Sequence, residues 1–294
     1  MSAITSPQGT RHLPGLGRRR GVNAVVTVIL GSTVLLALAI LAWVLIYVAI
    51  QGLNYLGPDF FVKTPPGNPG RGGGGFYNGI VGSFIVVGIA AAISIPLGVA
   101  AALYLVEVGR GWLVNVVRFF TDVLIGIPTI VTGAFVYVLW VTHFGFSGIA
   151  GGIALGIVML PLITRTTEEI LHLVPNGLRE GSYALGATRV QTIFKIVLPT
   201  ALPGITTGVM LAVARGMGET APLLLTALGN ELFTEYNPGK RMSTLSLQIF
   251  GNAISGFKAG QARAWSGALT LIAIVLVLTL TARFFAARTR ISQP

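Results

Sequence analysis

Glu180-Gly-Ser-Tyr-Ala-Leu-Gly-Ala-Thr-Arg-Val-Gln-Thr-Ile-Phe-Lys-Ile-Val-Leu-Pro199 is the stretch of this chain that decides its fold. It is a polar, helix-forming segment between long apolar runs. Gly186 is suited to end a first short helix, because glycine adopts the left-handed conformation of a helix C-terminus at little cost. Thr188 followed by Gln191 predicts a capping box that opens a second helix. The stretch therefore predicts a helix-turn-helix elbow on a membrane surface.

The second helix of this elbow is predicted to be amphipathic. Its apolar residues follow the i, i+3, i+4, i+7, i+8 pattern of one helix face, and they are Val190, Ile193, Phe194, Val197 and Leu198. The other faces carry the polar residues Arg189, Gln191, Thr192 and Lys195. Pro199 then ends the polar segment, and a new apolar run begins. We call residues 165–199 the elbow, and we interpret it as a docking surface for a protein in the cytoplasm.

The elbow resembles the EAA-loop signature of ABC-type importer permeases. The resemblance rests on Glu180, Gly186 and the tail Ile196-Val-Leu-Pro199, with Gly181 and Ser182 at positions where the family favours alanine. It implies that the elbow is a coupling helix seated in a cleft of an ATPase subunit. The residues that it implies for this contact are Glu180, Gly186, Ile193, Phe194 and Pro199. The alternative is an ordinary amphipathic surface helix.

The composition indicates a protein that crosses a membrane several times. The chain has 294 residues, of which 53% are hydrophobic and 10% charged, and its mean hydropathy is +0.80. The net charge of +11 does not indicate nucleic-acid binding, because the cations cluster at alternate ends of apolar runs without interleaved aromatics. Cysteine is absent, which excludes disulfides and thiolate metal sites. The first apolar run is far longer than the core of a signal peptide, so we expect a retained helix.

Six apolar runs predict an all-α, polytopic fold with six transmembrane helices. The runs are 22–50, 80–106, 116–141, 146–163, 200–228 and 266–285. Residues 1–21 are expected to form a disordered, basic cytoplasmic tail, and residues 51–79 a flexible extracytoplasmic loop rich in glycine and proline. Residues 80–285 would form the permease core, and 286–294 a short cytoplasmic tail. Glycines at four-residue spacing, such as Gly148, Gly152 and Gly156, predict close helix packing.

The distribution of cations predicts the orientation. With six spans, thirteen Lys and Arg residues fall on the side of the termini and the elbow, and six fall on the opposite side. The positive-inside rule then places both termini and the elbow in the cytoplasm.

The fifth apolar run contains two charges, in Arg215-Gly-Met-Gly-Glu-Thr-Ala-Pro222. Arg215 and Glu219 are four residues apart and would share a helix face. A charge near the bilayer centre costs about 3 kcal/mol, so such groups face a bundle interior or a wet cavity. Gly216, Gly218 and Pro222 favour a local break of the helix, which would expose backbone groups to a substrate. The alternative is a salt bridge that only fixes helix packing.

The segment from Arg215 to Leu224 resembles the fifth-span motif of phosphate importer permeases, and its ending is most similar to the A-type subunit. The third-span segment from Gly126 to Val131 resembles the same family. The resemblance implies that Arg215, Glu219 and Thr220 line the path of phosphate. Arg215 would offer a permanent cation to the oxyanion. Glu219 would hold Arg215 in place or pair with a cation of the partner permease.

The same resemblance implies the partners and the location. They are a homologous second permease subunit, a homodimeric ATP-binding subunit and an extracytoplasmic phosphate-binding protein, with the chain embedded in the inner membrane of a bacterium. We expect no cofactor in this chain, because it has no P-loop motif, and ATP and Mg would be bound by the ATPase. The run Gly70–Gly75 fits a dinucleotide-binding pattern only formally, because no strand precedes it.

Three other functions remain open at this point. Glu168, Glu169 and His172 have a spacing found in metal sites, so an intramembrane metal-dependent enzyme is one alternative, although neither other histidine is predicted nearby. A channel acting alone is another, but it would have no use for a docking elbow. The third is a permease for another oxyanion, such as sulfate or molybdate, because a single arginine does not distinguish these anions.

Overall fold

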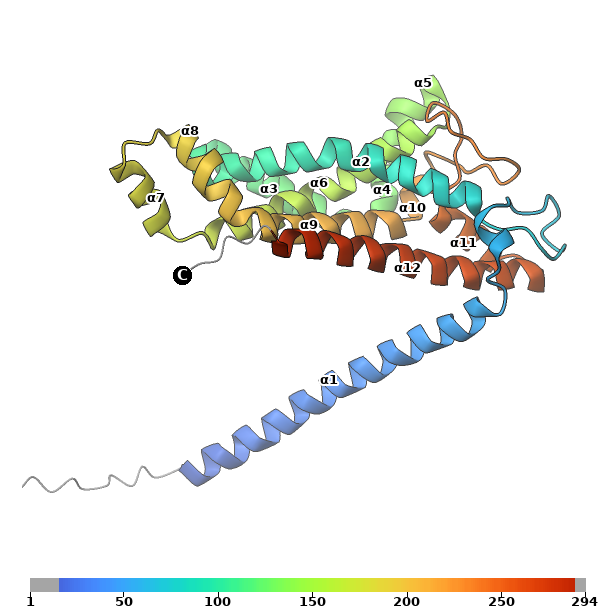
Figure 1. Ribbon diagram of the computed structural model, residues 1–294, viewed down its shortest axis with the longest axis horizontal. Coiled ribbons are helices and arrows are strands. Elements are labelled where there is room, and N and C mark those ends of the chain that lie inside the picture. Colours follow the sequence, from blue (N-terminus) through green and yellow to red (C-terminus); the bar gives the residue numbers. More distant parts are fainter. Residues whose placement is uncertain (1–15, 289–294) are drawn as a thin grey trace, which may run out of the picture. The chain divides into compact units, whose positions relative to one another are not determined.

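The computed structural model describes residues 16–288 and consists of helices joined by loops. The chain divides into two compact units, which meet between Ala49 and Ile50. The described part of the first unit is helix α1 (Leu16–Leu53) up to Ala49, and the last turn of this helix belongs to the second unit. The apolar part of α1 from Gly21 is long enough to cross a membrane (Figure 1). Residues 16–21, expected in the tail, belong to this helix. Arginine is a good helix former, which is consistent with its extension through the basic run. The predictions for residues 1–15 and 289–294 lie outside the described residues.

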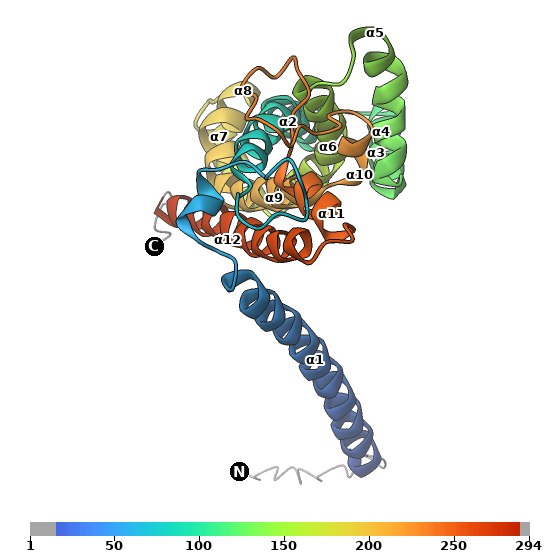
Figure 2. The same cartoon turned by 90° about the vertical axis from the view of Figure 1, so that its right-hand side faces the viewer.

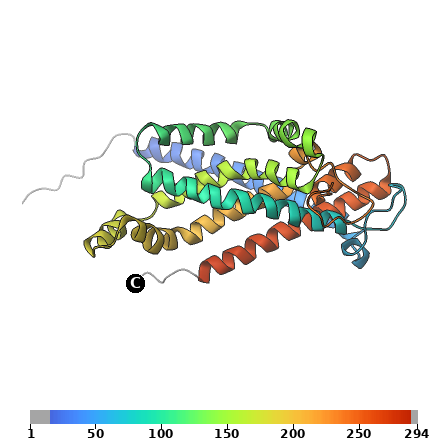
Figure 3. The ribbon, with the colours of Figure 1, turned by 90° about the horizontal axis from the view of Figure 1, so that it is seen from above.

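The second unit is a helical bundle built around four long helices, which are α2 (Tyr77–Leu103), α6 (Gly148–His172), α9 (Leu198–Gly218) and α12 (Lys258–Arg288) (Figure 2). The largest hydrophobic cluster joins α2, α6 and α9 through residues such as Val86, Leu155 and Ala212, all fully buried. The bundle has two ends. The elbow side carries α7 (Asn176–Ala184) and α8 (Arg189–Thr192), and the loop side carries residues 54–76 and 225–257 (Figure 3).

Small residues bring α2 and α6 together, as the glycine spacing predicted. A Cβ on Gly152 would lie 2.5 Å from Ile89, and a Cβ on Gly98 would lie 2.8 Å from Ile163. The contacting positions rise together along both helices, so α2 and α6 run in the same direction, from the loop side to the elbow side. Gly204 of α9 faces Ile170 of α6, and Gly216 faces Met159, so α9 runs in the opposite direction along α6.

The predicted third span, 116–141, is wrong as a single helix. The chain forms α3 (Trp112–Gly126) and α4 (Thr129–Val136), followed by a π turn and the short α5 (Thr142–Phe144). The two parts of this span are bent by 104° at Ile127-Pro128. Proline lacks an amide hydrogen and forces the preceding residue into an extended conformation, and Ile127 has φ −72° and ψ 130°. Because α2 and α6 run in parallel, this broken pair must return the chain along the bundle, and counting it as one span gives up to six candidate spans in the described part of the chain.

The fifth span also differs from its prediction of 200–228. A continuous helix runs from Arg189 to Gly218, through α8, a π turn over Ile193–Val197 and α9. Pro199 therefore does not interrupt the helix. It lies in the first turn of α9, directly after the π turn, where the regular hydrogen-bond ladder is already altered and the missing amide costs little. Past Gly218, the short helix α10 (Ala221–Leu224) ends the span earlier than expected.

The fourth and sixth spans are longer than the predicted 146–163 and 266–285. Helix α6 continues to His172, so residues 165–172 of the elbow are the last turns of this span. Helix α12 begins at Lys258. On the loop side, a short 3₁₀ helix (η1, Pro58–Phe61) precedes the glycine-rich loop, and α11 (Leu245–Ala253) packs between α2 and α12.

Candidate functional sites: the elbow and the break in the fifth span

The turn of the elbow has the geometry that the sequence predicted. Gly186 follows α7 with φ +81°, in the left-handed region where a side chain would be strained. Its amide donates to the carbonyl of Tyr183 at 2.9 Å, and the next amide, of Ala187, donates to the carbonyl of Ser182 at 3.1 Å. These bonds satisfy carbonyls at the end of α7 that have no partner within the helix.

The capping box at the start of α8 is confirmed. The Thr188 hydroxyl accepts a hydrogen bond from the Gln191 amide at 3.3 Å, and the Gln191 side chain accepts one from the Thr188 amide at 2.9 Å. Thr192 does not lie on an exposed polar face, as the helical pattern suggested. It is fully buried, and its hydroxyl lies 2.9 Å from that of Ser182, which ties α8 to α7.

The predicted apolar stripe of the elbow is split between two surroundings. Ile193 and Val197 are buried inside the bundle, whereas Val190 and Phe194 are exposed. The π turn over residues 193–197 has more residues per turn than an α-helix, so the stripe does not stay on one face. Leu185, at the turn, has 90% of its surface exposed. The apolar surface that the elbow offers to a partner is therefore formed by Leu185, Val190 and Phe194, and not by Ile193.

An open depression of about 510 Å³ lies beside this surface, and its walls include Gly177, Gly181, Gly186, Gln191 and Lys195. Glu180 is exposed on α7, and its carboxylate forms no hydrogen bond or ion pair within residues 16–288. It is thus available to another molecule, and it does not hold the elbow in shape. Pro199 is half-buried in the continuous helix beyond the turn.

Sequence reasoning missed Arg179, which holds the elbow instead. Its guanidinium donates to Glu107 Oε1 from Nη2 at 2.8 Å and from Nε at 3.1 Å. It also donates to the carbonyls of Leu171 at 3.0 Å and Val174 at 2.6 Å, and to Asn176 Oδ1 at 3.2 Å. The available signal was Glu107, an acidic residue at the end of a span on a side otherwise rich in cations.

The second site is the predicted break in the fifth span, which the structure confirms. Helix α9 ends at Gly218, Glu219 has extended backbone angles (φ −70°, ψ 130°), and α10 begins after Thr220. Arg215 Nε lies 3.3 Å from Glu219 Oε1, so the pair shares a face as expected. The Ser246 hydroxyl of α11 donates to the carbonyl of Glu219 at 2.9 Å and thereby fixes the break from the other side.

The two members of this pair differ in exposure. The Arg215 side chain is 48% exposed and that of Glu219 is 16% exposed. Within the described part of the chain, Glu219 is the one group that Arg215 contacts with a hydrogen bond or ion pair, so Nη1 and Nη2 of the guanidinium remain available. Thr220 is half-buried in the break, with its carbonyl accepting the amides of Leu223 and Leu224. The Arg215 guanidinium is thus held in position by Glu219, has nitrogens free to bind a ligand, and lies beside the non-helical backbone of the break.

Helix α4, which includes the end of the Gly126–Val131 segment, contacts α10, which belongs to the Arg215–Leu224 segment. A Cβ on Gly133 of α4 would lie 2.6 Å from the Cα of Pro222 in α10. The bend at Ile127-Pro128 and the break at Glu219-Thr220 therefore belong to helices in direct contact. Neither sequence segment predicted this contact by itself.

Glu168, Glu169 and His172 do not form a metal centre. Glu168 accepts a hydrogen bond from Arg118 Nε at 2.7 Å, and Glu169 pairs with Arg165 at 3.2 Å. His172 Nε2 lies 3.9 Å from Glu168 Oε1. Among residues 16–288, no group of three His, Asp or Glu side chains is arranged to hold a metal ion.

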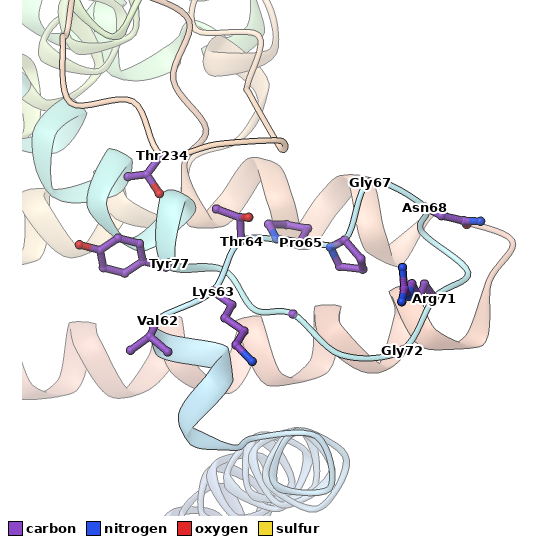
Figure 4. A pocket seen from close by; sticks show the side chains of 12 residues that line it. Val62, Lys63, Thr64, Pro65, Gly67, Asn68, Arg71, Gly72, Tyr77 and Thr234 are labelled. Carbon is purple, nitrogen blue, oxygen red and sulfur yellow. The ribbon is translucent and has the colours of Figure 1, made fainter.

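The glycine-rich loop on the loop side, expected to be flexible, is held by several contacts. Arg263 of α12 is fully buried and donates to the carbonyls of Pro69 and Arg71, both at 2.7 Å. Tyr55 bonds with the backbone of Gly73. The loop borders an open recess of about 830 Å³, whose lining includes Lys63, Thr64, Asn68, Arg71, Tyr77 and Thr234 (Figure 4).

Two tyrosines meet beside this recess. The hydroxyls of Tyr77 and Tyr236 lie 3.2 Å apart, and this hydrogen bond is the main reason that the pKa of Tyr236 is raised above its ordinary value. The Tyr236 phenol is therefore neutral near pH 7. The cations at the recess are Lys63, which pairs with Asp59 at 2.6 Å, and Arg71.

The fold is that of a transport permease. A family model described as "Binding-protein-dependent transport system inner membrane component" matches residues 94–291. Among solved structures, a bacterial alginate ABC transporter in complex with a pentasaccharide-bound periplasmic protein aligns with a TM-score of 0.65 over 94% of this chain and 99% of that chain, at 16% identity. The inward-facing MetNI methionine ABC transporter aligns with a TM-score of 0.54 over 72% of this chain and 93% of that chain, at 20% identity.

Named relatives of this chain identify the type of transport permease more closely. The "Phosphate transport system permease protein PstA" of Yersinia pestis is 41% identical over 273 residues, which are 92% of each chain. "PstA 1" of Mycobacterium tuberculosis (strain CDC 1551 / Oshkosh) is 39% identical over 93% of this chain and 92% of its own length. The PstA of Haemophilus influenzae is 40% identical over 86% of this chain and 89% of its own. The chain therefore belongs to the family of binding-protein-dependent transport system inner membrane components, and within it to the PstA permeases. It is a multi-pass membrane protein and a transport subunit that works with other subunits of an ABC transporter, and not an enzyme.

Proposed function

We propose that this chain is one permease subunit of an ATP-driven importer and forms half of the transmembrane path for inorganic phosphate. The observation that carries this proposal is the half-exposed guanidinium of Arg215, held at a helix break by Glu219. Two free nitrogens of one guanidinium match two oxygens of a phosphate in a bidentate pair. The names of the relatives agree with phosphate as the substrate. Glu219 would keep Arg215 in position between passages of the anion, and Thr220 would line the same stretch.

A homologous second permease would complete the path, because a single bundle surrounds the guanidinium on one side and leaves it exposed on the other. A pair of ATP-binding subunits would supply the energy and carry ATP and Mg. We assign their docking surface to the elbow, where the Glu180 side chain has no partner among the described residues and Leu185, Val190 and Phe194 are exposed. An extracytoplasmic phosphate-binding protein would meet the loop side, where the recess beside Lys63 and Arg71 opens.

This division of partners requires the elbow and both termini to lie in the cytoplasm of a bacterial cell. The count of thirteen cations against six supports that orientation. Since the chain has no cysteine, single cysteines at the exposed positions Gln191 and Asn68 provide a clean test. An impermeant thiol reagent added to intact cells should label the Asn68→Cys protein and spare the Gln191→Cys protein. The reverse labelling would overturn the orientation.

The function itself is tested by transport in the reconstituted complex of both permeases and the ATPase. We expect uptake of labelled phosphate that requires both ATP and the binding protein, is competed by arsenate and is unaffected by sulfate or molybdate. Competition by sulfate or molybdate at similar concentrations would reassign the substrate. Flux without ATP would indicate a channel instead.

A further inference from the structure

We propose that Arg179 is a positioning residue that transmits movement of the elbow to helices α2 and α6, and so couples ATP hydrolysis to opening of the path. The inference rests on the proposed function, because it assumes that the ATPase moves the elbow. It adds a specific mechanical connection, which consists of Arg179, Glu107 and the carbonyls of Leu171 and Val174. We call these groups the Arg179 clamp.

The clamp joins three elements with one side chain. Arg179 belongs to α7, the first helix of the elbow. Glu107 lies in the π turn that ends α2 (Tyr104–Val108), and its Oε1 accepts two hydrogen bonds from Arg179, at 2.8 and 3.1 Å. The carbonyl of Leu171, at 3.0 Å, lies in the last turn of α6, and that of Val174, at 2.6 Å, lies in the short turn between α6 and α7. A displacement of α7 therefore acts on the ends of two transmembrane helices at once.

The clamp is shielded from water. The Arg179 side chain is 15% exposed and that of Glu107 is 6% exposed. An ion pair on the surface is screened by salt and is easily separated. A buried ion pair whose arginine also donates hydrogen bonds to carbonyls is costly to separate. The connection should thus behave as a rigid joint, and not as a sliding contact.

Other contacts of α7 do not replace the clamp. The hydroxyl contact of Ser182 with Thr192 ties α7 to α8, the next part of the elbow. Within residues 16–288, Arg179 is the one residue of α7 that forms a hydrogen bond or ion pair with the end of α2. Arg165, on α6, pairs instead with Glu168 and Glu169 of its own helix.

The geometry also explains why the residue is arginine. The guanidinium presents its donors in a planar fork, so Nη1 reaches Val174 and Asn176 while Nη2 and Nε reach Glu107. A lysine ammonium at the same position would reach one of these groups but not bridge them. A glutamate at position 179 could not donate to the two carbonyls at all.

The experiment measures phosphate taken up per ATP hydrolysed in the reconstituted complex, for Arg179→Gln, Arg179→Lys, Glu107→Gln and the exchange Arg179→Glu with Glu107→Arg. We expect Arg179→Gln to keep its membrane abundance and its binding of the ATPase, and to lower the ratio at least tenfold. Arg179→Lys and Glu107→Gln should have intermediate ratios. The exchange should not restore coupling, because it restores the charges without the bonds to the carbonyls.

Arg110→Gln is the matched control, since Arg110 is an exposed cation just past Glu107 without a hydrogen bond or ion pair to residues 16–288.

A second measurement does not depend on the substrate. Spin labels on cysteines at Val108 and Ala184, both exposed, report the distance between the end of α2 and α7. With the clamp intact, this distance should stay constant between nucleotide-free and ATP-bound complexes, and with Arg179→Gln it should change. If the distance stays constant in the complex with the clamp intact but this complex takes up no phosphate, the clamp is retained and phosphate is rejected as the substrate. A distance that changes in the otherwise unaltered protein, or a normal uptake ratio in Arg179→Gln, would overturn the clamp. Loss of uptake that only follows loss of permease abundance or of ATPase binding would reduce Arg179 to a structural role and also overturn it.

Discussion

Arg179 at the elbow and Arg215 at the break of the fifth span show two opposite uses of the same side chain. Arg179 is 15% exposed and makes five hydrogen bonds, to a carboxylate, an amide oxygen and two backbone carbonyls. Arg215 is 48% exposed and has one contact, at 3.3 Å, with Glu219. A guanidinium whose donors are all satisfied is a structural joint, whereas one with free donors is available to a ligand. The comparison assigns mechanics to the elbow and anion passage to the break.

The largest effect should come from removing the charge of Arg215. Arg215→Gln should lower phosphate uptake by roughly 100-fold or more, since hydrogen bonds to charged groups contribute about 1.5–3 kcal/mol each and a bidentate pair has two. Membrane abundance should not change, because Arg215 has little packing role. The measurements are uptake in reconstituted vesicles and the amount of permease in the membrane.

The exchange Arg215→Glu with Glu219→Arg provides the decisive control for this prediction. If the pair only fixed helix packing, the exchange would restore both abundance and uptake. We expect abundance to stay normal and uptake to remain low, because the cation would then lie at position 219, where the native side chain is only 16% exposed. Full uptake in the exchanged protein would remove Arg215 from the substrate path.

The next largest effect should arise at the turn of the elbow. Gly186→Val forces a β-branched residue to φ +81°, which costs roughly 1–2 kcal/mol or more. We expect about a tenfold loss of uptake, with ATPase binding weakened and membrane insertion intact. Gly181→Ala is the control, since Gly181 lies in α7 with open space around it, and alanine there should stabilise the helix by about 0.5–1 kcal/mol. Normal uptake by Gly186→Val at normal abundance would argue strongly against a coupling role.

A smaller effect is expected for Arg215→Lys. The ammonium keeps the charge but lacks the planar fork, so one of the two bonds to phosphate is lost, at a cost of about 1 kcal/mol or roughly fivefold in uptake. The concentration of phosphate at half-maximal uptake should rise. An identical uptake curve for lysine and arginine would show that the site uses only charge.

The smallest effect should follow the loss of the cap of α8. Thr188→Ala removes the hydroxyl that accepts the Gln191 amide, which destabilises a helix by about 1 kcal/mol. Because α8 continues into α9 and is tied to α7 through Thr192, uptake should fall by less than about twofold. Faster hydrogen exchange of the amides around residue 191 is the measurable consequence, and unchanged exchange would show that the cap is dispensable.

Much of this architecture could be predicted from local sequence, and the remainder depended on contacts between distant segments. Gly186 and the Thr188–Gln191 box predicted the turn correctly, because backbone conformation and capping are local properties. Gly218 and Pro222 likewise predicted the helix break. By contrast, the burial of Ile193 depends on a π turn that no periodicity rule contains.

The proline positions show the same limit. Pro128 bends its span by 104°, whereas Pro199 lies within a continuous helix, although both stand in apolar surroundings. The difference comes from what precedes each proline, an extended residue in one case and a π turn in the other. Arg179 was missed for a related reason, because its partner Glu107 lies 72 positions away. The acidic residue at the end of α2 signals an unusual charge, but its position in the sequence does not identify the arginine that pairs with it.

The buried Arg263 has a consequence for how this protein is made. Its guanidinium holds the carbonyls of Pro69 and Arg71, which precede it by more than 190 positions. A chain is synthesised from its N-terminus, so the glycine-rich loop leaves the ribosome long before the last helix exists. The loop therefore keeps its contacts with earlier residues such as Tyr55 but lacks those of Arg263 until α12 is inserted, and the exposed Arg71 is accessible to proteases during that interval. The bonds from Arg263 are thus among the last contacts of the loop side to form during synthesis.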